Sequence, residues 1–407
     1  MKKTVSFVIG AYLFALPWDA FFLLETRLPA SPSFLFLGLA GFIYLFLVLF
    51  NINTKLNLPK VLWPLILLLI FFTFSLLWTS NMSRGIYDLV RLWSYLGALI
   101  LLYTLVKKMS LSVFGLLWFY ISGVLSVGIY SWVVHGFGGG RFSISESFNP
   151  SWYAAFLAWA IIASVAVYPR SNTSGKAISI IAIVLSTILL LLTQGRNAAI
   201  ALSLSLIIAL SVQIWPFYST HLLVRIKKGY LKSIAKALPI ILLIVIGTTF
   251  IMYETEYYLE LDRLETFFEY FGDDWDRATA GRYSLWIDFT KISLDQAFIG
   301  GGVSSAANLY GGLHLSERTP HNIYILTMVE YGIIGIILWL AFIIGIIRHA
   351  FLYQNKFVLV WIAFFSPIFG IGNDILYYKY WWMGLLLFLI LISDHSRKVK
   401  NNEGYLT

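Results

Sequence analysis

Residues 61–72, with the sequence VLWPLILLLIFF, are apolar without interruption. A barrel strand with one wetted face would alternate apolar and polar residues, whereas a helix surrounded by lipid is apolar on every side. A hydrocarbon layer roughly 30 Å thick needs about 20 such residues for each helix that crosses it. The stretch therefore predicts a transmembrane helix, and we reject a membrane β-barrel.

Runs of the same kind recur along almost the whole chain of 407 residues, of which 59% are hydrophobic and 12% are charged. A soluble domain needs more polar surface than this. The first run follows Met1-Lys2-Lys3 as in a signal peptide, but no clear small-x-small cleavage site comes after it, so we expect it to be retained. We predict an all-α polytopic membrane protein with about twelve transmembrane helices, at residues 4–24, 33–50, 61–79, 87–106, 111–134, 151–168, 177–193, 198–215, 237–252, 322–347, 357–371 and 375–393.

The positive charges predict the orientation of these spans. If the N-terminus is cytoplasmic, the inner connections hold most of the 29 lysines and arginines, so both termini are expected inside. The net charge of +9 is spread over short connections and does not form a patch for nucleic acid. The sequence has no cysteine, which excludes disulfides, thiolate nucleophiles and zinc–thiolate sites.

One connection is much longer than the others. Residues 253–320 separate the ninth and tenth predicted spans and fall on the outer side of the membrane. Long ordered loops are usually functional, so we expect a small extracytoplasmic subdomain with short helices there. The predicted organisation is transmembrane helices 1–9 in residues 1–252, the loop subdomain in 253–320, helices 10–12 in 321–393, and a cytoplasmic tail in 394–407.

Two arginines follow glycines in polar turns on the predicted outer side. Arg196 lies in TQGRNA (193–198), between the seventh and eighth spans, and Arg282 lies in TAGRYSLW (279–286), at the head of a helix predicted to reach about Ile292. Guanidinium binds phosphate through a planar fork and stays charged, so both are candidates for holding a pyrophosphate. Free backbone N–H groups at the start of the helix would assist Arg282. A snorkelling side chain and an ion pair are the respective alternatives.

A histidine opens the tenth predicted span, in PHNIY (320–324). Histidine is the common general base of enzymes, so His321 is a candidate to take a proton from an attacking hydroxyl; helix capping is its alternative role. Arg141 lies in a glycine-rich outer loop that ends in FNPSWY (148–153), where Asn-Pro marks the turn into the sixth span.

Several acidic residues need an explanation. Asp88 and Arg91 are three residues apart on one predicted helix and can pair with each other. Glu330 and Asp374, at or inside the membrane, are costly unless they are paired or face a wet cavity. The DDWD run (273–276) could hold a divalent ion, but a solvated acidic loop is commoner, so no metal site is predicted.

Taken together, these features resemble the O-antigen polymerase and O-antigen ligase superfamily. The features are Gly195-Arg196, Gly281-Arg282, HNIY (321–324) with EYGIIG (330–335), and their common placement around one long outer loop. The resemblance runs from about Arg141 to the C-terminus, while the first five spans match only as hydrophobic topology. It implies a GT-C-like glycosyltransferase of the bacterial inner membrane that uses an undecaprenyl-pyrophosphate-linked glycan as donor and needs neither a metal nor another cofactor.

The resemblance also implies residue roles and partners. Arg196 and Arg282 would clamp the donor pyrophosphate, His321 would activate or orient the acceptor hydroxyl, and Arg141, Asn322 and Tyr324 would help to bind substrate. The active site would face the periplasm. The partners would be the lipid-linked donor, a glycan or lipid A core acceptor, the surrounding lipids and, for a polymerase, a chain-length regulator; no nucleic acid is expected.

Polymerase and ligase differ only in the acceptor, and the sequence leaves both open. The Asn-Pro turn at 149–150 is similar to a turn that is common in polymerases, and we prefer the polymerase function for this reason. GIGND (370–374), in contrast, is similar to a stretch of some ligases. A protein O-oligosaccharyltransferase is disfavoured because no large soluble domain follows the last span. A secondary transporter shares the twelve-span layout, but the commonest kind has a central cytoplasmic loop, whereas the long loop here is external. A purely structural membrane protein would not need these cations at one face.

Overall fold

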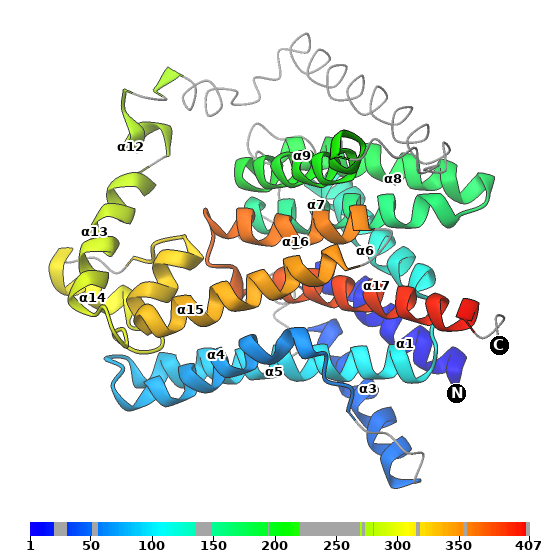
Figure 1. Ribbon diagram of the computed structural model, residues 1–407, viewed down its shortest axis with the longest axis horizontal. Coiled ribbons are helices and arrows are strands. Elements are labelled where there is room, and N and C mark those ends of the chain that lie inside the picture. Colours follow the sequence, from blue (N-terminus) through cyan, green and yellow to red (C-terminus); the bar gives the residue numbers. More distant parts are fainter. Residues whose placement is uncertain are drawn as a thin grey trace. The chain divides into compact units, whose positions relative to one another are not determined.

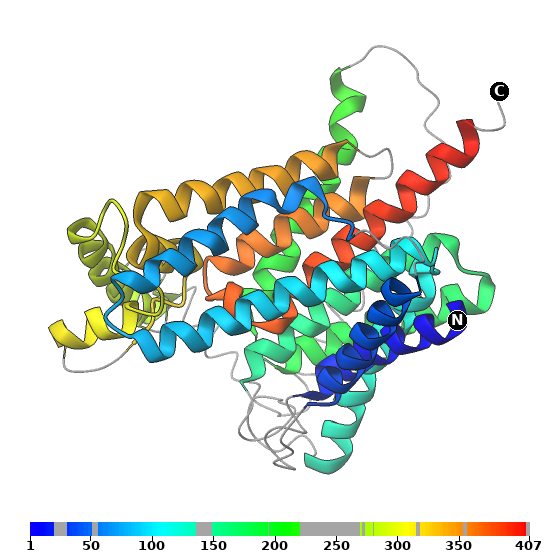
Figure 2. The same ribbon diagram turned by 90° about the horizontal axis from the view of Figure 1, so that it is seen from below.

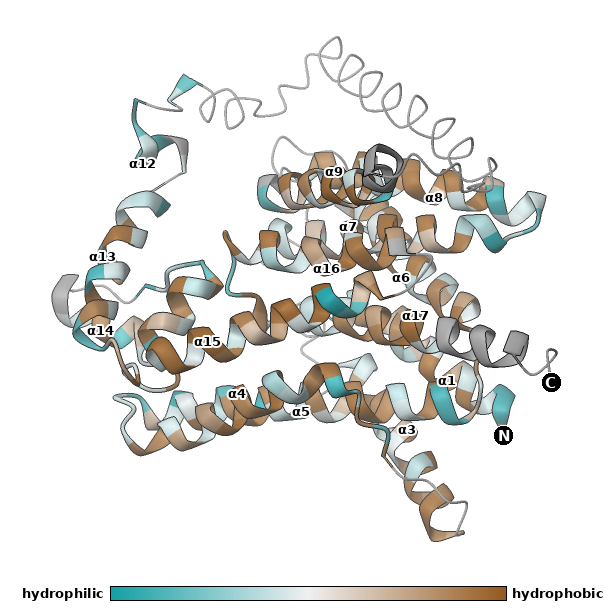
Figure 3. Ribbon diagram, in the orientation of Figure 1, coloured by the Kyte–Doolittle hydropathy of each residue, from teal (hydrophilic) through white to brown (hydrophobic). Residues whose placement is uncertain are grey.

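The computed structural model describes residues 1–19, 31–50, 56–135, 149–193, 195–219, 269–270, 273–279, 281–314, 318–352 and 356–403. Within these residues every regular element is helical. Seven helices are long and apolar enough to cross a membrane: Pro32–Leu49, Lys60–Leu77, Met82–Lys108, Val113–Val134, Pro150–Arg170, Thr173–Leu192 and Ile323–Phe351. Figure 3 shows hydrophobic residues along most of their length. The prediction of an all-α polytopic membrane protein is confirmed.

The helices coincide with most of the predicted spans. Each of the seven, and each of the shorter apolar helices Asn197–Gln213, Phe357–Gly370 and Lys379–Ser393, lies over one of them. Helix α1 (Lys2–Ala15) covers the first part of the predicted span 4–24. The predicted span 237–252 lies outside the described residues, so the count of twelve stays a prediction.

The chain divides into two compact units. Unit 1 comprises Met1–Ile9, Phe36–Val113 and Glu265–Thr407, and unit 2 comprises Gly10–Leu35 and Phe114–Leu264. Helix α1 and helix α3 (Pro32–Leu49) each begin in one unit and end in the other.

Unit 2 is built around α7 (Pro150–Val167), which packs against α8 (Thr173–Leu192) and α9 (Arg196–Ser219). Asn149 caps α7 by accepting a hydrogen bond from the Ser151 amide, which confirms the predicted Asn-Pro turn. The Tyr153 hydroxyl donates to the Val124 carbonyl of α6 (Val113–His135) over 2.9 Å. This buried hydrogen bond connects α7 with α6.

Unit 1 contains the helices α4 (Trp63–Phe74), α5 (Met82–Lys108), α15 (Ile323–Phe351), α16 (Lys356–Gly370) and α17 (Lys379–Glu403). Helix α15 packs on α4 and α16, and α17 packs on α5 and α16 (Figures 1 and 2). The buried rings of Trp339, Phe342 and Trp381 contact one another where α15 meets α17. Helix α17 continues to Glu403, so part of the predicted 394–407 tail is helical.

The described end of the long predicted loop folds onto unit 1. It contains α12 (Trp275–Ala278), α13 (Arg282–Asp295) and α14 (Ala306–His314), which confirms the predicted helix after Gly281. Helix α13 buries Leu285, Phe289 and Ile292 and packs against α14 and α15. Residues 253–268, the first part of the predicted subdomain, lie outside the described residues.

The connection that precedes α14 is hydrogen-bonded to a kink in α15. Gly332 interrupts the helix with φ of 61°, a conformation that favours glycine. The amides of Gly301 and Gly302 donate to the carbonyls of Val329 and Glu330 over 2.9 and 2.8 Å, and the Ile333 amide donates to Ala297. The extramembrane connection thus supplies the hydrogen bonds that the broken helix lacks.

Candidate functional site

Arg282 is the first residue of α13, directly after Gly281, whose φ of 78° turns the chain into the helix. Its Nη1 donates a hydrogen bond of 3.0 Å to the carbonyl of Gly372, in the loop between α16 and α17. Burial lowers the pKa of the guanidinium, and the nearby Asp374 carboxylate acts in the opposite direction. Arginine is effectively always protonated in proteins, so Arg282 is treated as a cation.

The start of α13 is not a vacant anion site. The Ser284 amide donates to Asp276 Oδ1 and the Tyr283 amide donates to Thr279 Oγ1, each over 2.9 Å. The expectation that free N–H groups assist Arg282 is therefore wrong for these two amides, because side chains of the preceding turn already satisfy them. A phosphate at Arg282 would be held by the guanidinium itself.

His321 adopts φ of 49° between Pro320 and the start of α15. Its side chain is 54% exposed, and its Nδ1 lies 3.5 Å from Oδ2 of Asp374, whose side chain is 7% exposed. Thr319 donates to the same oxygen over 3.1 Å. The Trp286 indole donates to the Pro320 carbonyl over 2.9 Å, which fixes α13 beside this segment. A buried carboxylate thus orients an accessible imidazole.

The loop at 370–374 therefore joins two of the predicted site residues. Gly372 accepts from Arg282, and Asp374 faces His321. Asp374 was not predicted as a site residue, although its place beside a span had marked it as needing a partner. The available signal was an acidic residue in a glycine-containing turn at the same predicted membrane face as His321.

Asn322 and Tyr324, both predicted to bind substrate, have other contacts in the structure. The Asn322 side chain caps α15, accepting from the amides of Tyr324 and Ile325 over 3.0 and 3.3 Å. The Tyr324 hydroxyl donates to the Pro367 carbonyl of α16 over 3.0 Å. These contacts hold the start of α15 in place, and capping falls to Asn322 instead of His321.

Arg196 belongs to unit 2. Arg196 is the first residue of α9, after Gly195, whose amide donates to Thr193 Oγ1 over 3.2 Å. A Cβ at Gly195 would overlap that of Ala154, so α7 lies close against this turn. Arg141 lies outside the described residues. The structure brings Arg282 and His321 together, whereas the joint clamp with Arg196 stays a prediction.

The acidic run at 273–276 acts locally. Asp274 accepts hydrogen bonds from the amides of Asp276 and Arg277 and forms an ion pair of 3.4 Å with the Arg277 side chain. Asp276 caps α13 through Ser284. Among the described residues, no group of three or more His, Cys, Asp or Glu side chains is arranged to hold a metal ion.

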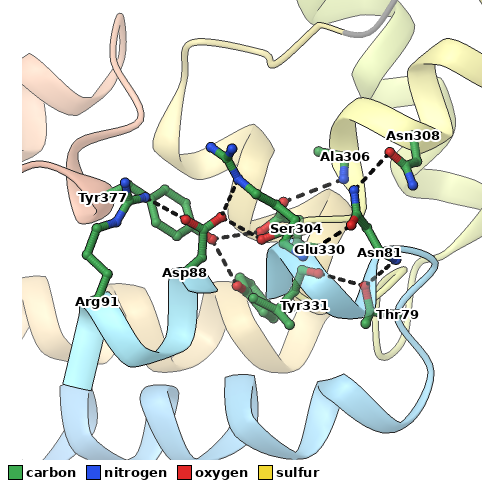
Figure 4. Close-up of polar contacts among 12 residues, drawn as sticks. Thr79, Asn81, Asp88, Arg91, Ser304, Ala306, Asn308, Glu330, Tyr331 and Tyr377 are labelled. Atoms are coloured by element: carbon green, nitrogen blue, oxygen red, sulfur yellow. Dashed lines mark hydrogen bonds and ion pairs between the residues drawn. The ribbon is translucent and has the colours of Figure 1, made fainter. Parts of the chain in front are cut away.

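A second polar cluster lies where α5 begins (Figure 4). Asp88 Oδ1 accepts from Arg91 Nη2 over 2.7 Å, which confirms the predicted pair, and its Oδ2 accepts from Arg84 and Ser304. Tyr377, in the 3₁₀ turn Ile375–Tyr377, donates its hydroxyl to the buried carboxylate of Glu330 over 3.0 Å. Asp88 is paired with two arginines and Glu330 is hydrogen-bonded, as the cost of a buried acid near lipid requires.

Fold and site together define a polytopic helical membrane protein that presents a guanidinium and a carboxylate-oriented imidazole at one loop. Residues 181–340 match the family model described as O-antigen ligase, which confirms the resemblance to the O-antigen polymerase and ligase superfamily. The matched region includes Arg196, Arg282 and His321. The match indicates an enzyme that transfers a lipid-linked glycan in the membrane. The search of curated proteins gave no match.

Proposed function

We propose that this protein polymerises undecaprenyl-pyrophosphate-linked repeat units, by transferring the glycan of one unit to a hydroxyl of another. The observation that carries the proposal is the meeting of Arg282 and the His321–Asp374 pair at residues 370–374. The alternative, transfer to lipid A core by a ligase, uses the same chemistry and differs only in the acceptor.

The reaction needs two kinds of help, and the site offers both. The acceptor oxygen attacks the anomeric carbon, the bond from that carbon to the pyrophosphate oxygen breaks, and the hydroxyl proton leaves. With Nδ1 directed at Asp374, the Nε2 atom of His321 is the nitrogen available to take that proton, and Asp374 holds the ring in this orientation. Arg282 neutralises the charge that develops on the departing pyrophosphate.

The remaining predicted residues extend this assignment. Arg196 serves as the second cation on the donor pyrophosphate and Arg141 contributes from its own loop. Asn322 and Tyr324 contribute to substrate binding indirectly, by positioning His321, since each side chain already makes hydrogen bonds that hold the start of α15. Direct displacement at the anomeric carbon inverts its configuration and needs no covalent nucleophile.

We place the active site at the periplasmic face of the bacterial inner membrane, with the twelve spans, the 253–320 subdomain and the cytoplasmic tail as predicted. The positive-inside bias supports this orientation. A chain-length regulator is a further proposed partner of a polymerase.

An assay with purified protein in nanodiscs tests the proposal. Lipid-linked repeat units are supplied alone and then with lipid A core. A ladder from the repeat units alone establishes a polymerase, whereas product that requires the core establishes a ligase. Absence of transfer with substrates of verified competence contradicts both, and substrate flux in vesicles without lipid-linked donor would then favour a transporter.

A further inference from the structure

The outer surface of the Asp88 cluster carries cations that the proposed reaction does not use. Arg84, Tyr87, Asp88 and Arg91 follow one another at helical spacing along one side of α5. The guanidinium carbons of Arg84 and Arg91 lie 5.9 and 5.5 Å from the centre of the Tyr87 ring. Two cations therefore flank one exposed aromatic ring.

The two arginine side chains of this cluster are more exposed than the carboxylate that they share. The side chains of Arg84 and Arg91 are 61% and 25% exposed, whereas that of Asp88 is 7% exposed. Each arginine is bonded to Asp88 through a single nitrogen, Nε of Arg84 and Nη2 of Arg91. Asp88 thus holds both side chains in place. Arg91 Nε is buried, so the donors offered to another anion are the terminal nitrogens of Arg84 and Nη1 of Arg91.

The cluster lies close to the candidate site within unit 1. The Arg91 guanidinium lies 5.3 Å from the centre of the Tyr377 ring, and the Tyr377 amide donates to the Asp374 carbonyl over 3.4 Å. The next residue, Tyr378, interacts electrostatically with Asp374 and also with Arg84, Asp88 and Arg91. Arg91 is therefore one short turn from the carboxylate that orients His321.

A polymerase has a requirement that this surface meets. Its acceptor is itself lipid-linked and keeps its pyrophosphate after the reaction, so two pyrophosphates have to be bound at the same time. Arg282 and Arg196 are assigned to the pyrophosphate that leaves. Guanidinium forks suit the second one, and an exposed aromatic ring between them suits the adjoining sugar.

We propose that Arg84 and Arg91, held by Asp88 and flanking Tyr87, form a subsite for the pyrophosphate of the lipid-linked acceptor. This inference rests on the proposed polymerase function. A ligase would have no such acceptor when it transfers to lipid A core.

A kinetic experiment tests the subsite in wild-type protein, Arg84→Gln and Arg84→Gln/Arg91→Gln. The donor is a lipid-linked unit whose own acceptor hydroxyl is blocked, so that it can only donate. The acceptor is an isotopically labelled unit, offered either on lipid pyrophosphate or as its methyl glycoside. We expect the KM for the lipid-linked acceptor to rise about tenfold or more in the double variant with kcat little changed, and the rate with the glycoside to be unaffected.

Arg348→Gln is the matched control, because Arg348 is an exposed arginine in the last turn of α15. The single variant guards against misfolding, since Arg91 keeps the ion pair with Asp88 there. Equal loss with both acceptors would assign the arginines to a structural or donor role and overturn the subsite. A wild-type ladder with unchanged acceptor kinetics in the double variant would overturn it as well.

A binding measurement separates this inference from the proposed function. Native mass spectrometry with undecaprenyl pyrophosphate should show two bound per wild-type chain and per Arg348→Gln chain, and one per double-variant chain. Displacement of the second molecule by phosphatidylglycerol would identify a general headgroup site and overturn the assignment. Absence of a wild-type ladder would overturn the polymerase function and the acceptor role with it.

Discussion

The Nδ1 atom of His321 lies 3.5 Å from Oδ2 of Asp374, so an exposed imidazole is oriented by a buried carboxylate. A carboxylate in this position fixes the orientation and the tautomer of the imidazole.

Asp374→Asn should therefore lower kcat by about 100-fold, because a misoriented imidazole loses much of the contribution of a general base. Substrate binding should be retained, because Asp374 is not expected to touch the donor. Thr319→Val is the matched control, since it removes only the 3.1 Å hydrogen bond to the same oxygen. Steady-state kinetics of glycan transfer check both variants, and an Asp374→Asn enzyme with normal kcat would remove this pair from the mechanism.

Arg282→Ala should reduce transfer by about 100-fold or more, because a preorganised donor facing the departing pyrophosphate is lost. Arg282→Lys should also be poor, since ammonium lacks the planar fork. Arg277→Ala is a suitable control, because that arginine is largely exposed and paired with Asp274. Full activity in Arg282→Ala, measured on inserted protein, would contradict the role given to it.

Asn322→Ala should destabilise the protein by about 1 kcal/mol through loss of the α15 cap. Asn322→Ser keeps a capping oxygen, so it should recover both stability and transfer. Thermal unfolding in detergent, read beside activity, checks this pair of variants. If Ser restores the unfolding temperature but leaves transfer impaired, Asn322 contacts substrate directly as well.

Gly332→Ala should destabilise unit 1 by about 1–3 kcal/mol, because φ of 61° is strained for alanine and the new Cβ would overlap the backbone of Phe298 and Ile299. Gly97→Ala, in α5, has nothing within 4 Å of the new Cβ and should be neutral or slightly stabilising. The measurement is the unfolding temperature of each of the two variants relative to the wild-type protein. Equal effects of the two substitutions would show that the kink is not held by the connection at 297–302.

Glycan transfer should survive strong chelation, because Asp274 and Asp276 are engaged in local hydrogen bonds and an ion pair. The measurement is the rate of ladder formation with and without excess EDTA. An EDTA-sensitive enzyme that a divalent cation restores would return this run to consideration as a metal site.

The membrane-spanning helices could be predicted because lipid requires each backbone polar group to be satisfied within its own segment. That requirement leaves a long apolar run, such as residues 323–347, in the sequence itself. The cap at Asn149 and the helix after Gly281 were predictable for a related reason, since both depend on neighbouring residues.

The pairing of His321 with Asp374 could not be predicted, because it depends on how the start of α15 meets the loop after α16. The same holds for Ser304 with Asp88, whose contact joins α5 to the connection before α14. Contacts between distant segments leave no periodic signal in one sequence. The sequence shows only that an acidic residue in the membrane needs a partner. Which residue is the partner depends on the fold.

The hydrogen bonds from Gly301 and Gly302 to Val329 and Glu330 also impose an order on biogenesis. Translation delivers the donors first, and their acceptors follow when the first part of α15 is synthesised. Asp374 emerges later still. A nascent chain therefore carries Arg282 and His321 before the carboxylate that orients the imidazole, so chemical competence is a late event in its maturation.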